Sequence, residues 1–273
     1  MAIPRRGDLE ALRLRGHRGG IIAPHRAMAG LSWTAWRLLS TLLLTGGGLA
    51  GYLLSLPWLG NAWELLFIRV RDFLGISAPI GIQALELAGG ITFTLPTVAA
   101  VTPLPDDRVL WIAGTVSALV FLLSFLLPQR FTPLRYFLRL LVLLQASAIG
   151  FFALSPEPFP YRLADHVFLL LTAGLIVMGL VPLVLGLTLH VFDLPFWRKL
   201  LLTLLILVHL AVFVPLNVLL HVWLVLSGTA VLMPVLFLVF GLLLDVFIFV
   251  AFYGTALSWR GSLEGRDPPP VHV

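Results

Sequence analysis

Polar side chains of the kinds that carry protons and bind metals interrupt the apolar second half of the sequence. His209, Asn217 and His221 lie in the stretch LVHLAVFVPLNVLLHVWLV, and Asp245 lies in the next apolar run. Polar groups are rare inside membranes, because leaving water costs them several kcal/mol unless they are paired or neutral. Each of these residues therefore needs either a hydrogen-bond partner or a functional role.

Depth along the helices predicts that His209 and Asp245 meet near the midplane of the membrane. At a rise of about 1.5 Å per residue, they lie about 16 and 18 Å from the cytoplasmic ends of two neighbouring helices. Gln145 and Asn217 complete this polar group, and Asn217 or a water is expected to bond the backbone carbonyl that Pro215 frees. The pair can serve a proton relay or substrate binding. It can also be a buried hydrogen bond that only locks two helices together.

A second pair, His166 and His221, lies near the outer ends of two predicted helices at closely similar depths. Two histidines at matched depth on neighbouring helices are able to bind a single haem b. The alternative is that both are ordinary residues near amphipathic helix ends, with no cofactor bound. The sequence contains no cysteine, which excludes disulfides, thiolate metal sites and a cysteine nucleophile.

Small and acidic residues near the predicted helix ends have structural interpretations. Gly47 and Gly51 match the GxxxG spacing that lets two membrane helices approach closely, so we expect them on a packing face. Asp106 and Asp107 suit a divalent metal, but they also suit a turn leading into a helix. Asp165 is placed to cap a helix, where its negative charge is favoured. No metal site is expected.

The composition requires that these residues sit in a membrane. Of the 273 residues, 59% are hydrophobic and 11% are charged, a balance outside that of ordinary soluble domains. The apolar residues come in unbroken runs rather than in the alternating pattern of barrel strands, so we expect an all-α membrane protein. A spanning helix needs about 20 apolar residues. On this basis the sequence predicts a bundle of six transmembrane helices, at residues 35–57, 109–128, 136–154, 165–190, 198–225 and 229–257.

The basic residues predict how this bundle is oriented. With the N-terminus in the cytoplasm, fourteen of the 18 lysines and arginines fall on the cytoplasmic side. Cytoplasmic loops of membrane proteins carry such an excess. We therefore expect a multi-pass protein of the inner (cytoplasmic) membrane with both termini in the cytoplasm. Its parts are a flexible basic tail (1–33), a transmembrane domain (34–258) and a disordered tail (259–273).

Residues 58–108, between the first and second helices, predict a small cap on the outer side. Within 61–74 apolar residues recur at helical spacing, as in a helix that lies in the membrane interface. Residues 79–101 are apolar enough for a seventh span, but that span would move three basic residues to the outer side and weaken the charge excess. The alternation in ITFTLPTV instead predicts extended chain, with a re-entrant segment as the alternative.

The scarcity of polar residues inside the bundle favours a non-catalytic function. The basic residues cluster beside the apolar runs, which is typical of an anionic membrane surface and not of nucleic-acid binding. We expect an accessory or scaffold subunit of a larger membrane assembly that serves export, an envelope polymer or respiration. Its partners would be lipid and another membrane protein or a second copy. The alternatives are a small proton-coupled transporter using His209 and Asp245, and a single-haem cytochrome using His166 and His221.

Overall fold

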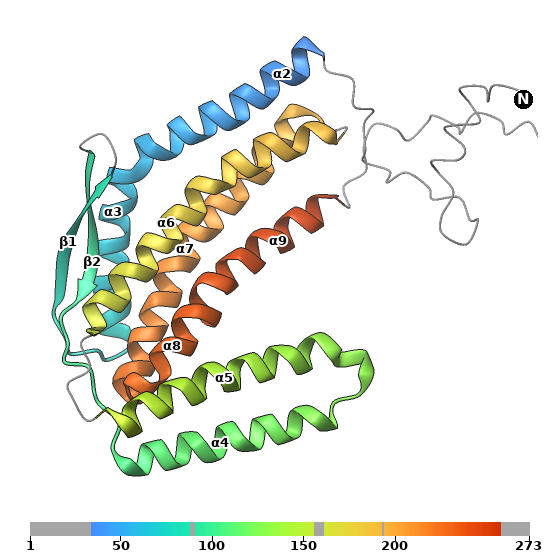
Figure 1. Cartoon of the computed structure of the whole chain (residues 1–273). Helices are drawn as coiled ribbons and strands as arrows, with labels where there is room; N and C mark the ends of the chain where they lie inside the picture. The colour runs from blue at the N-terminus through green and yellow to red at the C-terminus, as the bar shows by residue number, and fades with distance from the viewer. Residues whose placement is uncertain (1–33, 88–90, 156–160, 193, 258–273) are drawn as a thin grey trace, which may run out of the picture.

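The computed structural model describes residues 34–87, 91–155, 161–192 and 194–257, so the two predicted tails lie outside the described residues. Within these ranges six helical stretches are long and apolar enough to span a membrane (Figure 1), which confirms the predicted helical, multi-pass architecture. They are Ala35–Phe73 (α2, η1, α3), Asp107–Leu126 (α4), Gln129–Leu154 (η2, α5), Leu163–Thr188 (α6), Phe196–Ser227 (α7) and Ala230–Thr255 (η4, α8, η5, α9).

Polar caps begin several of these helices. The side chain of Asp106 accepts a hydrogen bond of 2.7 Å from the backbone N–H of Val109, at the start of α4. Asp165 closes a capping box at the start of α6, where its carboxylate accepts from the N–H of Arg162 at 3.2 Å. Both carboxylates therefore occupy N-terminal positions that satisfy otherwise free backbone donors.

The first stretch is longer than one membrane crossing requires. α2 (Ala35–Leu42) continues through a π-helical segment, η1 (Leu43–Gly47), into α3 (Gly48–Phe73). The segment 61–74, expected as a separate interfacial helix, is continuous with the spanning part through Pro57, which lies inside α3. Trp63 and Phe67 on its inner face are almost completely buried.

A β-hairpin follows α3, in the region where the sequence predicts extended chain. β1 (Ile80–Leu87) and β2 (Ile91–Val98) pair antiparallel, with Ile80 opposite Val98. β2 packs against α3 and α6 (Figure 1). The approach to α3 depends on Gly60, because a Cβ atom at that position would lie 2.9 Å from the carbonyl oxygen of Thr94.

The centre of the bundle is the antiparallel pair α6 (Leu163–Thr188) and α7 (Phe196–Ser227). Each of these helices buries thirteen residues. They approach closely where Gly174 meets Val214, since a Cβ atom at Gly174 would lie 2.5 Å from a methyl carbon of that valine. α3 covers one side of this pair, and the last stretch covers another.

The last stretch is not a uniform α-helix. It begins as η4 (Ala230–Leu232) and α8 (Met233–Val235), passes through an eight-residue π-helix, η5 (Leu236–Leu243), and ends as α9 (Leu244–Leu257). A π-helix bonds each N–H five residues back instead of four and is often found at functional sites. Here η5 packs against both α6 and α7.

α4 (Asp107–Leu126) and α5 (Thr132–Leu154) form a helical hairpin that lies to one side of the other helices (Figure 1). The two helices pack mainly against each other, and α5 also contacts η4 and α8. The backbone N–H of Ala230 in η4 donates to the carbonyl oxygen of Pro103. This bond joins the segment before α4 to the start of the last helical stretch.

Candidate functional site

The structure brings His166 of α6 and His221 of α7 together. Their ring centroids lie 5.8 Å apart, with the ring planes tilted by 42°. The two residues are 0% and 1% exposed, so both rings lie fully inside the protein. The structure therefore places side by side the two histidines whose depths the sequence matched.

None of the four ring nitrogens of this pair makes a close hydrogen bond among the described residues, although the backbone of Phe240 lies near enough to interact with the ring of His221. A neutral imidazole carries one N–H donor and one lone-pair acceptor, so His166 leaves one of each unused. An unsatisfied buried polar group costs about 1 to 3 kcal/mol. The pair is therefore a place where a bound water, ion or ligand would be strongly favoured.

Aromatic rings and the π-helix enclose the pair. The rings of Tyr161 and Phe237 each lie with their centroids 6.0 Å from that of His166. Gly241 of η5 faces His221, because a Cβ atom there would lie 3.8 Å from the Cε1 atom of the histidine and would collide with Leu170. A larger residue at 241 would thus push the π-helix away from the histidines.

The surroundings of the pair argue against haem. A porphyrin is a broad flat ring that must lie between its two axial histidines and extend well beyond them. Here both imidazoles are fully enclosed, and Gly241 of η5 packs closely against His221 and Leu170 beside them. The residues present suit a much smaller guest than a porphyrin.

The structure does not bring His209 against Asp245. The ring of His209 stacks on Phe213 at 5.6 Å and contacts Phe252 at 5.2 Å. Asp245 lies seven residues before Phe252, a rise of about 10 Å along the same helix. In the described part of the chain no hydrogen bond or ion pair joins the two residues, and Oδ1 of the buried Asp245 has no hydrogen-bond partner.

The two polar amides of the predicted midplane group bond to backbone carbonyls of the last stretch. Nε2 of Gln145 donates to the carbonyl oxygen of Val231 at 3.1 Å, and Nδ2 of Asn217 donates to that of Phe240 at 2.5 Å. Asn217 thereby joins α7 to the π-helix, one turn of α7 away from His221. These bonds connect α5 and α7 to the last helical stretch, at η4 and η5 respectively. They also place Asn217 near the histidine pair.

The backbone carbonyl left without a partner by Pro215 is bonded by a tryptophan, where the sequence suggested Asn217 or a water. Proline has no N–H, so the carbonyl of Ala211 loses its partner within the helix. The indole Nε1 of Trp63, in α3, donates to that oxygen at 2.7 Å. No local pattern identifies this contact, because 148 residues separate the two groups along the chain.

Gly47 and Gly51, expected on a packing face, do not make the close approach to another helix among the described residues. A Cβ atom at Gly47 or Gly51 would meet nothing within 4 Å, whereas one at Gly48 would lie 2.8 Å from Cβ of Pro182. The close approach to α6 is therefore made by Gly48. Gly47 and Gly51 leave a small-residue surface open on the described part of the chain.

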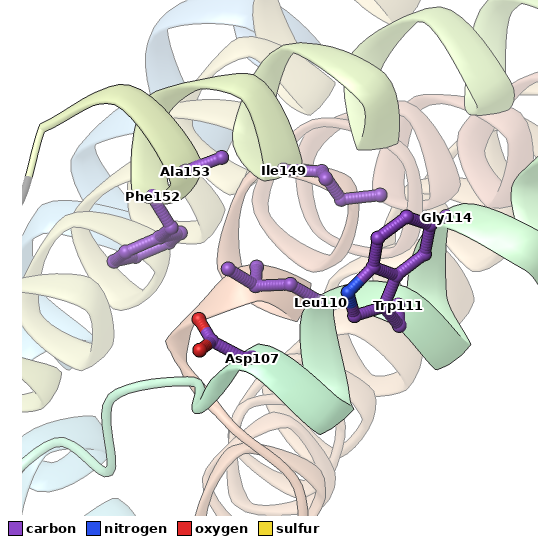
Figure 2. A pocket seen from close by; sticks show the side chains of 7 residues that line it. All are labelled: Asp107, Leu110, Trp111, Gly114, Ile149, Phe152 and Ala153. Carbon is purple, nitrogen blue, oxygen red and sulfur yellow. The ribbon is translucent and has the colours of Figure 1, made fainter.

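A pocket of about 520 Å³ lies between the first turns of α4 and the last turns of α5. Figure 2 shows Asp107 and Trp111 of α4 facing Ile149 and Phe152 of α5 across it. Among the described residues no group of three or more histidine, cysteine, aspartate or glutamate side chains is placed to hold a metal ion. Comparisons with protein-family models, curated proteins and solved structures found no match to this chain.

Proposed function

We propose that the protein is a non-catalytic subunit of a larger assembly in the inner membrane, and that the α4–α5 hairpin docks its partner, another integral membrane protein. The observation that carries this proposal is the poor packing of the hairpin. Within the described residues α4 buries Ser117 and Ser124 and α5 buries Ala148, whereas α6 and α7 bury thirteen residues each.

Open small residues support a protein partner rather than lipid alone. Membrane helices associate through small residues that let backbones approach closely. A Cβ atom at Gly114 of α4 or at Gly150 of α5 would meet nothing within 4 Å, so neither glycine is used for packing inside the described part of the chain. A helix of a partner that lies along the hairpin would use both.

Unfilled space along the hairpin points the same way. Besides the pocket between α4 and α5, a second pocket of about 360 Å³ lies between α4 and η4, with Ser117, Gln145 and Thr229 in its lining. Both pockets open to the surface of the protein, where a partner could enter them. Side chains of a partner helix would fill them and would give polar contacts to the hydroxyl and amide groups.

The charge pattern supports the proposed orientation. Both chain ends and the α4–α5 and α6–α7 connections carry most of the basic residues, which favours a cytoplasmic location for them. In this orientation the β-hairpin and the outer ends of α6 and α7, with the histidine pair, lie on the opposite side. The two pockets beside the α4–α5 hairpin then lie toward that outer side as well.

Photo-crosslinking in intact membranes tests the docking surface. A photoreactive amino acid is placed at Val116 or Leu119 of α4, both exposed, and at Val208 of α7, an exposed control on another face. We expect the hairpin positions to give one discrete adduct heavier than the 30.0 kDa chain, and the control to give lipid adducts only. Lipid adducts at all three positions would overturn the proposal, and so would an adduct that contains two copies of this chain.

A matched pair of glycine substitutions separates docking from folding. Gly114→Leu fills the open space on the hairpin, and Gly46→Leu fills equally open space on η1. The first is expected to abolish the adduct while leaving the thermal stability of the purified protein within about 1 kcal/mol, as for other exposed sites. The second is expected to leave the adduct intact. Equal effects of the two changes would contradict a specific role of the hairpin.

One observation favours proton-coupled transport as a second candidate. Asp245 is 4% exposed, and its Oδ1 atom has no hydrogen-bond partner among the described residues. Intramembrane carboxyl groups of this kind often belong to proton relays. Proton uptake into liposomes that contain the purified protein, abolished by Asp245→Asn and retained in His209→Phe, would establish this candidate; uptake that survives Asp245→Asn would eliminate it.

A further inference from the structure

The distance between the ring centroids of His166 and His221 limits the size of a ligand that could bind both rings. A metal ion bonded to one nitrogen of each ring, at about 2.0 to 2.1 Å, places two imidazole centroids roughly 6 to 6.5 Å apart. The observed distance is 5.8 Å. The ring centres therefore lie slightly closer than a single bridging ion requires, and the enclosed surroundings leave little room for additional ligands from water.

We infer that His166 and His221 form a two-coordinate binding site for one monovalent copper ion. Zn²⁺ takes four ligands in most protein sites, and Ca²⁺ and Mg²⁺ take six or more, largely oxygen atoms. Among the described residues no third histidine or acidic side chain joins these two in a cluster. Cu⁺ is satisfied by two nitrogen ligands on opposite sides, and imidazole is a good ligand for copper.

The charge of the site also favours a monovalent ion. Two neutral imidazoles contribute no negative charge, and burying uncompensated charge is costly. The acidic residue nearest along the chain, Asp165, is held in the cap of α6 through the N–H of Arg162. Asp245 lies four residues after Gly241, about 6 Å along the last stretch, and is the one buried carboxyl group among the described residues.

Aromatic rings enclose the pair. The ring centroids of Phe237 and Tyr161 both lie 6.0 Å from that of His166. Tyr161 also lines a pocket of about 570 Å³, together with Thr102, Arg162 and Ala164. This pocket reaches the ring that touches His166 and so offers an entry route beside the start of α6.

Competition with the Cu⁺ chelator bicinchoninate, under reducing and oxygen-free conditions, tests the assignment on the full chain. We expect one Cu⁺ per protein, and X-ray absorption with two nitrogen neighbours. His221→Phe is expected to weaken binding by more than about 100-fold, because loss of a partner outside the ligand set alone weakens metal binding about 10- to 100-fold. His221→Met is expected to restore binding, since a thioether is a ligand that Cu⁺ prefers.

Control variants remove four of the five other histidines and keep His190. His209→Phe removes a ring that contacts only Phe213 and Phe252 in the described aromatic contacts, and it is expected to leave binding unchanged. A variant with His17, His25 and His272 all replaced by alanine removes the histidines outside the described residues and is expected to retain the one-to-one stoichiometry. Both controls keep His166 and His221.

Several outcomes would overturn the assignment. They are no Cu⁺ binding by the native chain, equal affinity for Zn²⁺, Cu⁺ binding that persists in His221→Phe, or a Soret absorption band that shows haem in the purified protein. Because these measurements need only the purified chain, their failure is independent of whether the α4–α5 hairpin docks a partner.

Discussion

The bond between Trp63 and the carbonyl of Ala211 predicts a measurable energetic coupling between two distant parts of the sequence. Trp63→Phe removes the indole N–H while keeping an aromatic ring in the same place. Because Pro215 has no N–H, the carbonyl of Ala211 then loses the partner that the structure shows. Pro215→Ala supplies a backbone N–H to that carbonyl and so makes the indole dispensable.

The size of this coupling follows from the cost of an unsatisfied carbonyl. Such a group costs about 1 to 3 kcal/mol when buried, and hydrogen bonds between membrane helices measure about 0.6 kcal/mol on average and at most about 1.7. Trp63→Phe also leaves a cavity, but that cost is the same in both backgrounds and cancels in a double-mutant cycle. We expect Trp63→Phe to cost about 1 kcal/mol more in the wild-type background than in Pro215→Ala.

Equilibrium unfolding in mixed micelles, with increasing sodium dodecyl sulfate, measures the four free energies of the cycle. Trp58→Phe serves as the control, because Trp58 is 77% exposed and is expected to cost less than about 0.5 kcal/mol in either background. A cost of Trp63→Phe that is equal in the two backgrounds would refute the reasoning, since the indole bond would then be independent of the proline.

Three further substitutions test the packing. Gly48→Ala is expected to destabilise the chain by about 1 to 3 kcal/mol through overpacking, whereas Gly47→Ala, in open space, is expected to be neutral or stabilising by up to about 1 kcal/mol; thermal denaturation compares the two. Gly174→Ala is expected to cost a similar amount and to be partly rescued by Val214→Ala, which removes the colliding methyl groups; failure of the rescue would contradict the contact. Asn217→Leu is expected to cost about 1 kcal/mol in the same unfolding assay, and no loss would mean that its bond to η5 is not made.

The sequence predicts the spans well because the free energy of transferring a helical segment into lipid depends on the side chains of that segment alone. The six runs correspond to the six helical stretches, with ends that differ by a few residues. The first stretch differs most, since α3 continues to Phe73 instead of ending at 57. Pro57 is tolerated inside it, and the side chains of Trp63 and Phe67 bury enough surface to hold the continuation in place.

A contact between two helices could be predicted only where both residues lie close to helix ends that meet on the same side of the bundle. His166 lies a few residues after the start of α6 and His221 a few residues before the end of α7, so a small error in the helix bounds did not matter. For His209 and Asp245 the distances were counted from the inner ends over about a dozen residues each. The observed contact of His209 with Phe252 shows that those inner ends are not level.

The partners of the polar residues were beyond prediction for a further reason. The bond from Asn217 to Phe240 depends on the π-helical geometry of η5, which no residue pattern in LFLVFGLL announces. The bond from Trp63 to Ala211 depends on how α3 crosses α7. Both are set by tertiary packing, which overrides local preference.

The π-helix η5 also sets how α9, which follows it, is rotated about its own axis. Each residue of an α-helix turns the chain by about 100°, so a change of hydrogen-bond register by one residue in η5 would turn α9 by about that angle. The bond from Asn217 to the carbonyl of Phe240 holds the present register. Loss of this one bond would therefore free α9 to turn about its own axis, and Asp245 near its start would turn with it.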